Sequence, residues 1–251
     1  MIFEVSDTSY DRFMGRYSVR LAPVFADFAG VSGRVLDVGA GTGALTAELV
    51  QRVGAENVAA AEPSAVFADA LRRRLPGVDV QHAPAEQLPW GDATFDAALA
   101  QLVVAFMADA PAGAREMRRV VRPSGVVSAC MWDRDNMEMF AAINRSREAI
   151  APETFERSAL KYRTREEIVE LFEDAGLRDV ESAPLEVEAS YTGFDDFWDA
   201  LSSGVGPAGQ WVQELSEERR AALPDVLRRE LGEPDGPFTL SGRAWAVRGT
   251  V

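Results

Sequence analysis

A glycine-rich turn that follows an acidic residue is the part of this sequence with the clearest chemical potential. Residues 34–43 read RVLDVGAGTG, an apolar run that contains Asp37 and ends in three alternating glycines. Glycine has no Cβ, so backbone N–H groups and a helix N-terminus can approach a ligand closely at such a turn. The same turn fits the relaxed dinucleotide pattern G-x-G-x-x-G/A, and the glycines alone therefore leave the ligand open.

Two carboxylates narrow the choice of ligand. Asp37 precedes Gly39 by two positions, where a fixed negative charge opposes a pyrophosphate and favours an ammonium or a sulfonium. S-adenosylmethionine carries both of these cations and no phosphate. Glu62 ends the next apolar run, where a carboxylate can accept both ribose hydroxyls of an adenosine. NAD sites share such an acid, so Glu62 indicates an adenosine ligand without choosing between the two.

The surrounding sequence predicts the elements that position these residues. Short β-branched runs alternate with helical segments, a pattern typical of βαβ units that build a parallel sheet. Ser64 is expected to cap one of the intervening helices, and Pro111 is expected in the first turn of another. The predicted strands are residues 34–39, 57–62, 78–82, 95–100 and 124–132.

Segments on either side of this core also have clear patterns. Apolar residues at helical spacing predict an amphipathic helix over residues 18–29, and a capping box that begins at Thr164 predicts a helix that ends at Gly176. Alternation over residues 185–189 and 238–247 predicts an antiparallel strand pair at the sheet edge. The helical insertion between these strands carries a Phe/Trp stripe, which indicates either core packing or a substrate-facing wall.

Composition and charge limit the classes of partner. Lys and Arg total 26 against 40 Asp and Glu, a formal charge of −14 that would repel nucleic acid and anionic membranes. Cys130 is the single cysteine, so no internal disulfide can form, and its apolar neighbours indicate a buried structural thiol. The sequence shows no signal-peptide pattern and no apolar run of membrane-spanning length, and we therefore expect a cytoplasmic protein. We also expect it to be a monomer or a homodimer.

The core resembles the small-molecule class I S-adenosylmethionine-dependent methyltransferases of the UbiE and methyltransferase type 11 kind. The resemblance covers residues 34–132 and depends on several motifs together. Besides DVGAGTG and Glu62, these are APAEQLP at residues 83–89, with the acids of residues 92–96, and EMRRVVRPSG at residues 116–125.

The resemblance implies a set of cofactor contacts. The glycine turn would pass under the methionine portion, Glu62 would hold the ribose, and the lid over the cofactor would come from the N-terminal segment. Surface packing is the alternative for the lid residues, because tyrosines near a terminus have many structural roles. The cofactor residues expected by position are Asp37, Gly39, Ala40, Gly41, Glu62, Pro63, Ala85, Glu86 and Gln101, with Tyr10, Arg16 and Tyr17 in the lid.

Two departures from the family pattern concern adenine recognition and acid–base chemistry. Pro84 stands where relatives often have an aspartate for the adenine amino group, and Ala105 stands where they often have a histidine. His82, the single histidine, is expected to be structural. Asp133, just after the fifth predicted strand, is the first candidate for a general base, with a turn cap as the alternative.

These features predict a single domain over residues 1–251, built on a Rossmann-like, doubly wound α/β fold. Its sheet would be seven-stranded and mostly parallel, with an antiparallel C-terminal edge pair and a helical cap. We expect an N-terminal lid or helix over residues 1–30, a cofactor-binding core over 31–133, and substrate-side helices with the strand pair over 134–251.

The expected activity is methyl transfer from S-adenosylmethionine to an O, N or C atom of a small-molecule acceptor, with S-adenosylhomocysteine as the product and no metal. In-line displacement at an activated methyl needs mainly alignment. Two alternatives stay open at this stage: a nucleotide-binding Rossmann oxidoreductase, and a non-catalytic S-adenosylmethionine-binding protein on the same fold.

Overall fold

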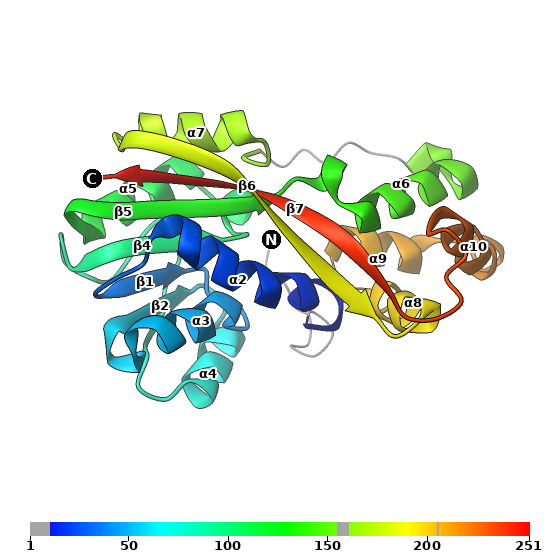
Figure 1. Cartoon of the computed structure of the whole chain (residues 1–251), viewed down its shortest axis with the longest axis horizontal. Helices are drawn as coiled ribbons and strands as arrows, with labels where there is room; N and C mark the ends of the chain where they lie inside the picture. The colour runs from blue at the N-terminus through cyan, green and yellow to red at the C-terminus, as the bar shows by residue number, and fades with distance from the viewer. Residues whose placement is uncertain (1–10, 155–160, 205) are drawn as a thin grey trace.

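A single seven-stranded sheet runs through the structure, a computed structural model that describes residues 11–154, 161–204 and 206–251. Its strand order is β3-β2-β1-β4-β5-β7-β6, with helices on both faces (Figure 1). The five core strands pair in parallel, as the alternating pattern predicted. They are β1 (Val35–Val38), β2 (Val58–Glu62), β3 (Asp79–His82), β4 (Phe95–Gln101) and β5 (Val121–Trp132).

The predicted antiparallel edge pair is also confirmed. β7 (Phe238–Thr250) lies between β5 and β6 (Arg178–Tyr191) and runs antiparallel to both. Both strands are long, and Figure 1 shows them extending from the core toward the helices at the other end of the molecule. One difference concerns β5, which begins at Val121, before the predicted start, because pairing with β4 resumes across a register shift.

Five helices cover the core sheet. Residues such as Val35 and Leu99 pack with α2 and α3 on one face, whereas Leu36 and Ala98 pack with α5 and α7 on the other. The local signals are confirmed, since Ser64 caps α4, Pro111 lies in the first turn of α5, and the capping box opens α7. The helices are α2 (Arg16–Ala29), α3 (Ala44–Val53), α4 (Ala65–Arg74), α5 (Ala110–Val120) and α7 (Arg165–Asp174).

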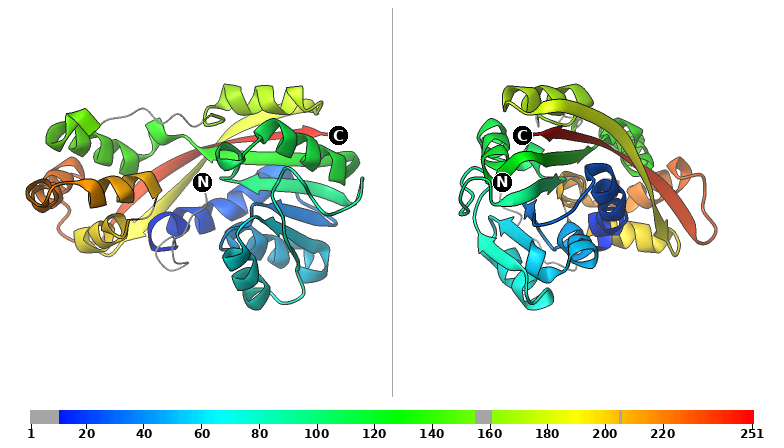
Figure 2. Two further views of the ribbon diagram at one scale, coloured as in Figure 1. Left: turned by 180° about the vertical axis from the view of Figure 1, so that it is seen from behind. Right: turned by 60° about the vertical axis from the view of Figure 1, so that its left-hand side comes forward.

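Four further helices form a cap around the projecting half of β6 and β7. Figure 2 shows them gathered at the end of the molecule opposite α3 and α4. Phe194, Phe197 and Trp211 are buried in the same apolar cluster as Tyr191, which confirms core packing for most of the Phe/Trp stripe. The cap helices are α6 (Glu138–Ile150), α8 (Phe194–Ser202), α9 (Gly206–Glu214) and α10 (Glu217–Glu230).

Short helical turns complete the described chain. The N-terminal helix starts two residues earlier than predicted and follows a π-helical turn, because its buried face continues through Phe13 and Tyr17. No helix in the described ranges is long and apolar enough to cross a membrane. The turns are η1 (Asp11–Gly15), η2 (Ala55–Asn57), η3 (Val104–Phe106), η4 (Arg134–Asn136) and η5 (Pro152–Thr154).

Candidate functional site

The carboxyl ends of the core strands open onto a cavity of about 400 Å³, a volume suited to a small-molecule ligand. Core and cap both contribute to its wall. The core supplies Asp37, the glycine turn, Glu62, Pro63, Pro84, Ala85, Glu86 and Gln101; the N-terminal segment supplies Phe13, Met14 and Ser18; the far side supplies Trp132, Arg134, Phe140, Arg163 and Pro207.

Asp37 is a buried carboxylate that faces this cavity. The Thr46 hydroxyl donates to its Oδ2 over 2.6 Å, which helps to hold the side chain in place. Burial raises its pKa to about 7, and the nearby charge of Glu62 acts in the same direction. A cationic ligand beside Asp37 would offset both effects and favour the ionised form.

Glu62 joins the glycine turn to the start of α4. Gly41 N–H donates to its Oε2 and Ser64 N–H donates to its Oε1, each over 2.8 Å. Burial raises the pKa of this carboxyl, while the two N–H donors oppose the shift. Each carboxylate oxygen has a second lone pair, so Glu62 can still accept hydroxyl groups from a ligand.

The backbone N–H groups of the glycine turn are used within the protein. Those of Gly39 and Ala40 donate to Ala61 O over 2.8 and 3.1 Å, and that of Gly43 donates to Ala40 O over 2.9 Å. With Gly41 bound to Glu62, these four donors are directed away from any pyrophosphate. A dinucleotide site relies on such donors, so this geometry weighs against the oxidoreductase alternative.

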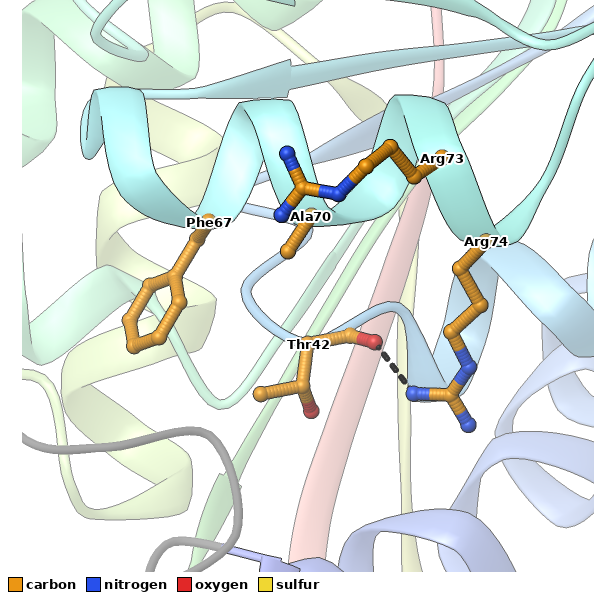
Figure 3. Close-up of a pocket in the computed structure, with 5 residues that line it drawn as sticks. All are labelled: Thr42, Phe67, Ala70, Arg73 and Arg74. Atoms are coloured by element: carbon orange, nitrogen blue, oxygen red, sulfur yellow. Dashed lines mark hydrogen bonds between the residues drawn. The ribbon is translucent and has the colours of Figure 1, made fainter.

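Side chains fix the conformation of the turn from both sides. Gly39 has a φ of +72°, and a Cβ there would lie 2.5 Å from Val103 Cγ1, so glycine is required. Figure 3 shows Arg74 of α4 beside Thr42 of the turn, where Arg74 Nη1 donates to Thr42 O over 2.9 Å. The shallow pocket drawn there also includes Phe67, which borders the main cavity as well. None of the residues that line it is a carboxylate.

Residues expected near the adenine line one part of the cavity. Pro63, Ala85 and Glu86 are all there, together with Pro84. Glu86 also accepts a hydrogen bond from Asp109 N–H over 3.0 Å, which ties its side chain to the start of α5. His82 Nε2 lies 2.9 Å from Pro63 O and is absent from the cavity wall, in keeping with a structural role.

Gln101 combines an occupied donor with an unused acceptor. Its Nε2 donates to Ser18 O over 3.1 Å, whereas its buried Oε1 has no hydrogen-bond partner among the described residues. The next residue, Leu102, has a φ of +65°, a strained conformation for a non-glycine residue. An unsatisfied buried acceptor in a cavity wall is suited to a donor group on a ligand.

Of the residues predicted for the lid, the two that the structure describes, Arg16 and Tyr17, do not line the cavity. Arg16 pairs with Asp196 over 3.0 Å and stacks on the Tyr191 ring, while Tyr17 is fully buried, with its hydroxyl 3.4 Å from that of Tyr191. These contacts correspond to the packing alternative. Tyr10 lies outside the described residues.

The same N-terminal segment reaches the cavity through other side chains. The residues of this segment that line the cavity are Phe13, Met14 and Ser18, which precede and follow Tyr17 in the chain. The prediction chose residues by type, but the helix turns the tyrosine toward the apolar core. Helical spacing places positions 13, 14, 17 and 18 on one side of the segment, so periodicity alone does not separate Tyr17 from the cavity residues.

Asp133 lies between two cavity residues without lining the cavity itself. It accepts hydrogen bonds from Arg243 Nε over 2.9 Å and from Asn136 Nδ2 over 3.0 Å. Its neighbours Trp132 and Arg134 do line the cavity. This arrangement fits the turn alternative, and a catalytic role for Asp133 stays a prediction without geometric support.

The Rossmann-like fold and these carboxylates resemble the arrangement of class I methyltransferases. The strand order with its reversed β7, the acid in β1 and the acid at the end of β2 occur together around one cavity. Residues 36–129 match the family model described as a methyltransferase domain, which confirms the resemblance predicted from the sequence.

Individual relatives agree with this class. A demethylmenaquinone methyltransferase of Mycolicibacterium paratuberculosis is 35% identical over 114 residues, which cover 45% of this chain and 48% of the relative. A malonyl-[acyl-carrier protein] O-methyltransferase of Halorhodospira halophila is 27% identical over 229 residues, covering 86% and 75%. The chain thus spans less than half of the first of these relatives.

Solved structures extend the similarity of the fold beyond the core. A putative type II methyltransferase from Anaeromyxobacter dehalogenans superposes with a TM-score of 0.66 at 23% identity. The superposition covers 94% of this chain and 95% of that one. The cap and edge strands therefore belong to a shared architecture.

Proposed function

We propose that this protein transfers a methyl group from S-adenosylmethionine to a small-molecule acceptor. The observation that carries the proposal is that Asp37 and Glu62, two buried carboxylates, face one cavity beside a glycine turn. Negative charge beside a turn whose Gly39, Ala40, Gly41 and Gly43 N–H groups already have acceptors within the protein suits a cationic adenosyl ligand better than a diphosphate.

The cavity residues fit this ligand group by group. Asp37 and the free Gln101 Oε1 suit the ammonium and sulfonium of the methionine portion, and Glu62 suits the ribose hydroxyls. Pro63 and Ala85 offer apolar contact to the adenine. Pro84 has no side-chain acceptor, so hydrogen bonds to the adenine edge must come from Glu86 or from backbone groups.

Methyl transfer requires little acid–base chemistry from this chain. S-adenosylmethionine supplies a methyl group that is already activated on a sulfonium, and the protein must hold the acceptor in line and exclude water. Trp132 and Phe140 supply apolar walls for the acceptor. The carboxylates among the lining residues are Asp37, Glu62 and Glu86, all placed at the cofactor side, so an acceptor with an available lone pair fits best.

The side chains that line the cavity are also compatible with one alternative function. With no described carboxylate or histidine at the acceptor side, a non-catalytic S-adenosylmethionine-binding protein is also compatible with the geometry. Turnover separates the two, since a binding protein would retain affinity without forming S-adenosylhomocysteine with any acceptor. The relatives are named for a demethylmenaquinone and a malonyl thioester carrier, and such different acceptors leave the O, N or C atom open.

Thermal unfolding with added ligands tests the cofactor directly. S-adenosylmethionine or S-adenosylhomocysteine at about 100 times its Kd should stabilise the protein by roughly 2.7 kcal/mol, or about 5–10 °C in Tm. NAD(H) at the same concentration should leave Tm unchanged. A shift with NAD(H) and none with the adenosyl ligands would contradict the proposal.

A further inference from the structure

Three arginines from separate segments meet at the acceptor side of the cavity. Arg134 lies in η4, Arg147 in α6 and Arg163 just before α7. Arg134 and Arg163 line the cavity. Arg147 lies on α6, the helix that also carries Phe140, over which Arg134 is placed. Burial lowers the pKa of Arg134 to about 10, and the charges of Arg163 and Arg147 act in the same direction.

Among the described residues, none of these three arginines forms an ion pair with a carboxylate. Arg119, Arg243 and Arg248, for example, each pair with a carboxylate, but none of the ion pairs in the described part of the chain includes one of the three. Arg147 Nε is buried without a hydrogen-bond partner among those residues. The chain has 40 acidic residues against 26 basic ones, so a shortage of carboxylates does not explain why no ion pair of the described residues includes these three arginines.

Nearby acids are present but do not neutralise the cluster. Asp135 acts on Arg134, and Glu214 acts on Arg147, in each case after the larger opposing effect of burial. Glu167 is engaged by the backbone N–H groups of Arg163 and Thr164 over 2.9 and 3.1 Å. Clustered cations without direct partners are costly in a partly buried site, and an anion would relieve that cost.

Aromatic rings hold two of the guanidinium groups in place. Arg134 lies over Phe140 at 4.1 Å from the ring centroid, and Arg147 lies over Trp211 at 4.5 Å. Stacking uses the face of a guanidinium and leaves its N–H edge free for a carboxylate or phosphate. The guanidinium groups of Arg134 and Arg147 are therefore oriented before a ligand binds.

We propose that Arg134 and Arg163 bind a carboxylate or phosphate group of the acceptor, with Arg147 adding positive charge behind them. The acceptor would be an organic anion whose apolar body packs on Trp132 and Phe140. This inference rests on the proposed function, because it takes the other side of the cavity to hold S-adenosylmethionine.

The sheet order places the two charged regions apart. Asp37 is in β1 and Arg134 follows β5, with β4 between these strands, so strand spacing alone separates them by roughly 10 Å. A cavity that is acidic at one side and basic at the other orients an anionic acceptor with its charged group away from Asp37. The reacting atom would then lie on the part of the acceptor remote from the arginines.

Matched pairs of small molecules test the proposal. Straight-chain and aryl carboxylates, their primary amides and the corresponding phosphate monoesters are titrated into protein saturated with S-adenosylhomocysteine, at up to millimolar concentration, by calorimetry. The charged members should bind about tenfold more tightly than the amides, since charge-assisted hydrogen bonds are lost in the amide. Comparing carboxylates with phosphates identifies which oxyanion is preferred.

Variants assign the preference to the arginines. Arg134→Gln and Arg163→Gln should each remove most of the preference for the anion, while Arg165→Gln, at an exposed arginine that pairs with Glu166, should keep it. The affinity for S-adenosylhomocysteine should be unchanged in all three variants.

Three results would overturn the inference: equal binding of anions and amides, no binding of any anion, or a tenfold loss of S-adenosylhomocysteine affinity in Arg134→Gln. The last would assign the arginines to the carboxylate of the cofactor. If wild-type protein does not bind S-adenosylhomocysteine, the proposed function fails, and the anion titrations on the protein alone still decide the inference.

Discussion

At the scale of single residues, Asp37 makes a pH-dependent contribution to the stability of the protein. Its pKa of about 7 in the folded chain lies well above that of an exposed aspartate, because burial disfavours the charge. A raised folded pKa means that the folded state holds its proton more firmly than the unfolded state. The contribution of Asp37 to stability is therefore greatest below pH 4 or so, and it declines as pH rises from about 4 to about 7.

Ligand binding should show the opposite trend. A cation favours ionised Asp37, so the affinity for S-adenosylhomocysteine should increase from about pH 5.5 and level off above about pH 7, with release of a proton. Glu62 acts in the same direction through its raised pKa. Calorimetry in two buffers of different ionisation enthalpy measures the number of protons released on binding. Asp37→Asn should flatten much of the pH dependence; an unchanged profile in that variant would exclude Asp37 as its source.

At the scale of elements, local patterns predicted the strands and helix ends well, and the site less completely. Strand alternation, the Ser64 cap and the capping box at Thr164 depend on near neighbours in the chain, and all are confirmed. Asp37 and Glu62 could be placed because parallel strand ends meet at one edge. Arg163, just before α7, and Pro207, in α9, reach the cavity only through tertiary packing, and no local signal marks them.

The N-terminal helix offers a test of packing against lid function. Tyr17 is fully buried in the core, and Met14 lines the cavity. Tyr17→Ala should lower the free energy of unfolding by about 3–5 kcal/mol, as loss of a buried aromatic ring does, with little change in S-adenosylhomocysteine affinity of the folded fraction. Met14→Ala should weaken binding and change stability less.

Urea denaturation and calorimetry on the same samples separate these two effects. Tyr17→Phe serves as the mild control, because it removes only the hydroxyl that lies 3.4 Å from Tyr191. A large loss of ligand affinity in Tyr17→Ala, with stability kept, would restore the lid assignment for this residue.

At the scale of the whole molecule, the long β6–β7 pair connects the core sheet to the helical cap (Figure 1), and residues of both line the cavity. The family match is confined to residues 36–129, within the core. Acceptor choice should then depend on the cap and its junction, where Arg134, Phe140 and Arg163 lie. The acidic surface, with a formal charge of −14, still predicts no affinity for nucleic acid.

Calorimetric titration of S-adenosylhomocysteine into wild-type protein and carboxylate variants tests the central claim most directly. The account predicts binding to the wild type, a loss of about 1–3 kcal/mol in binding free energy for Asp37→Ala and for Glu62→Ala, and no loss for Asp92→Ala, an exposed acid of the same core. Absence of binding to the wild type, or an affinity in Asp37→Ala and in Glu62→Ala equal to that of the wild type, would contradict it.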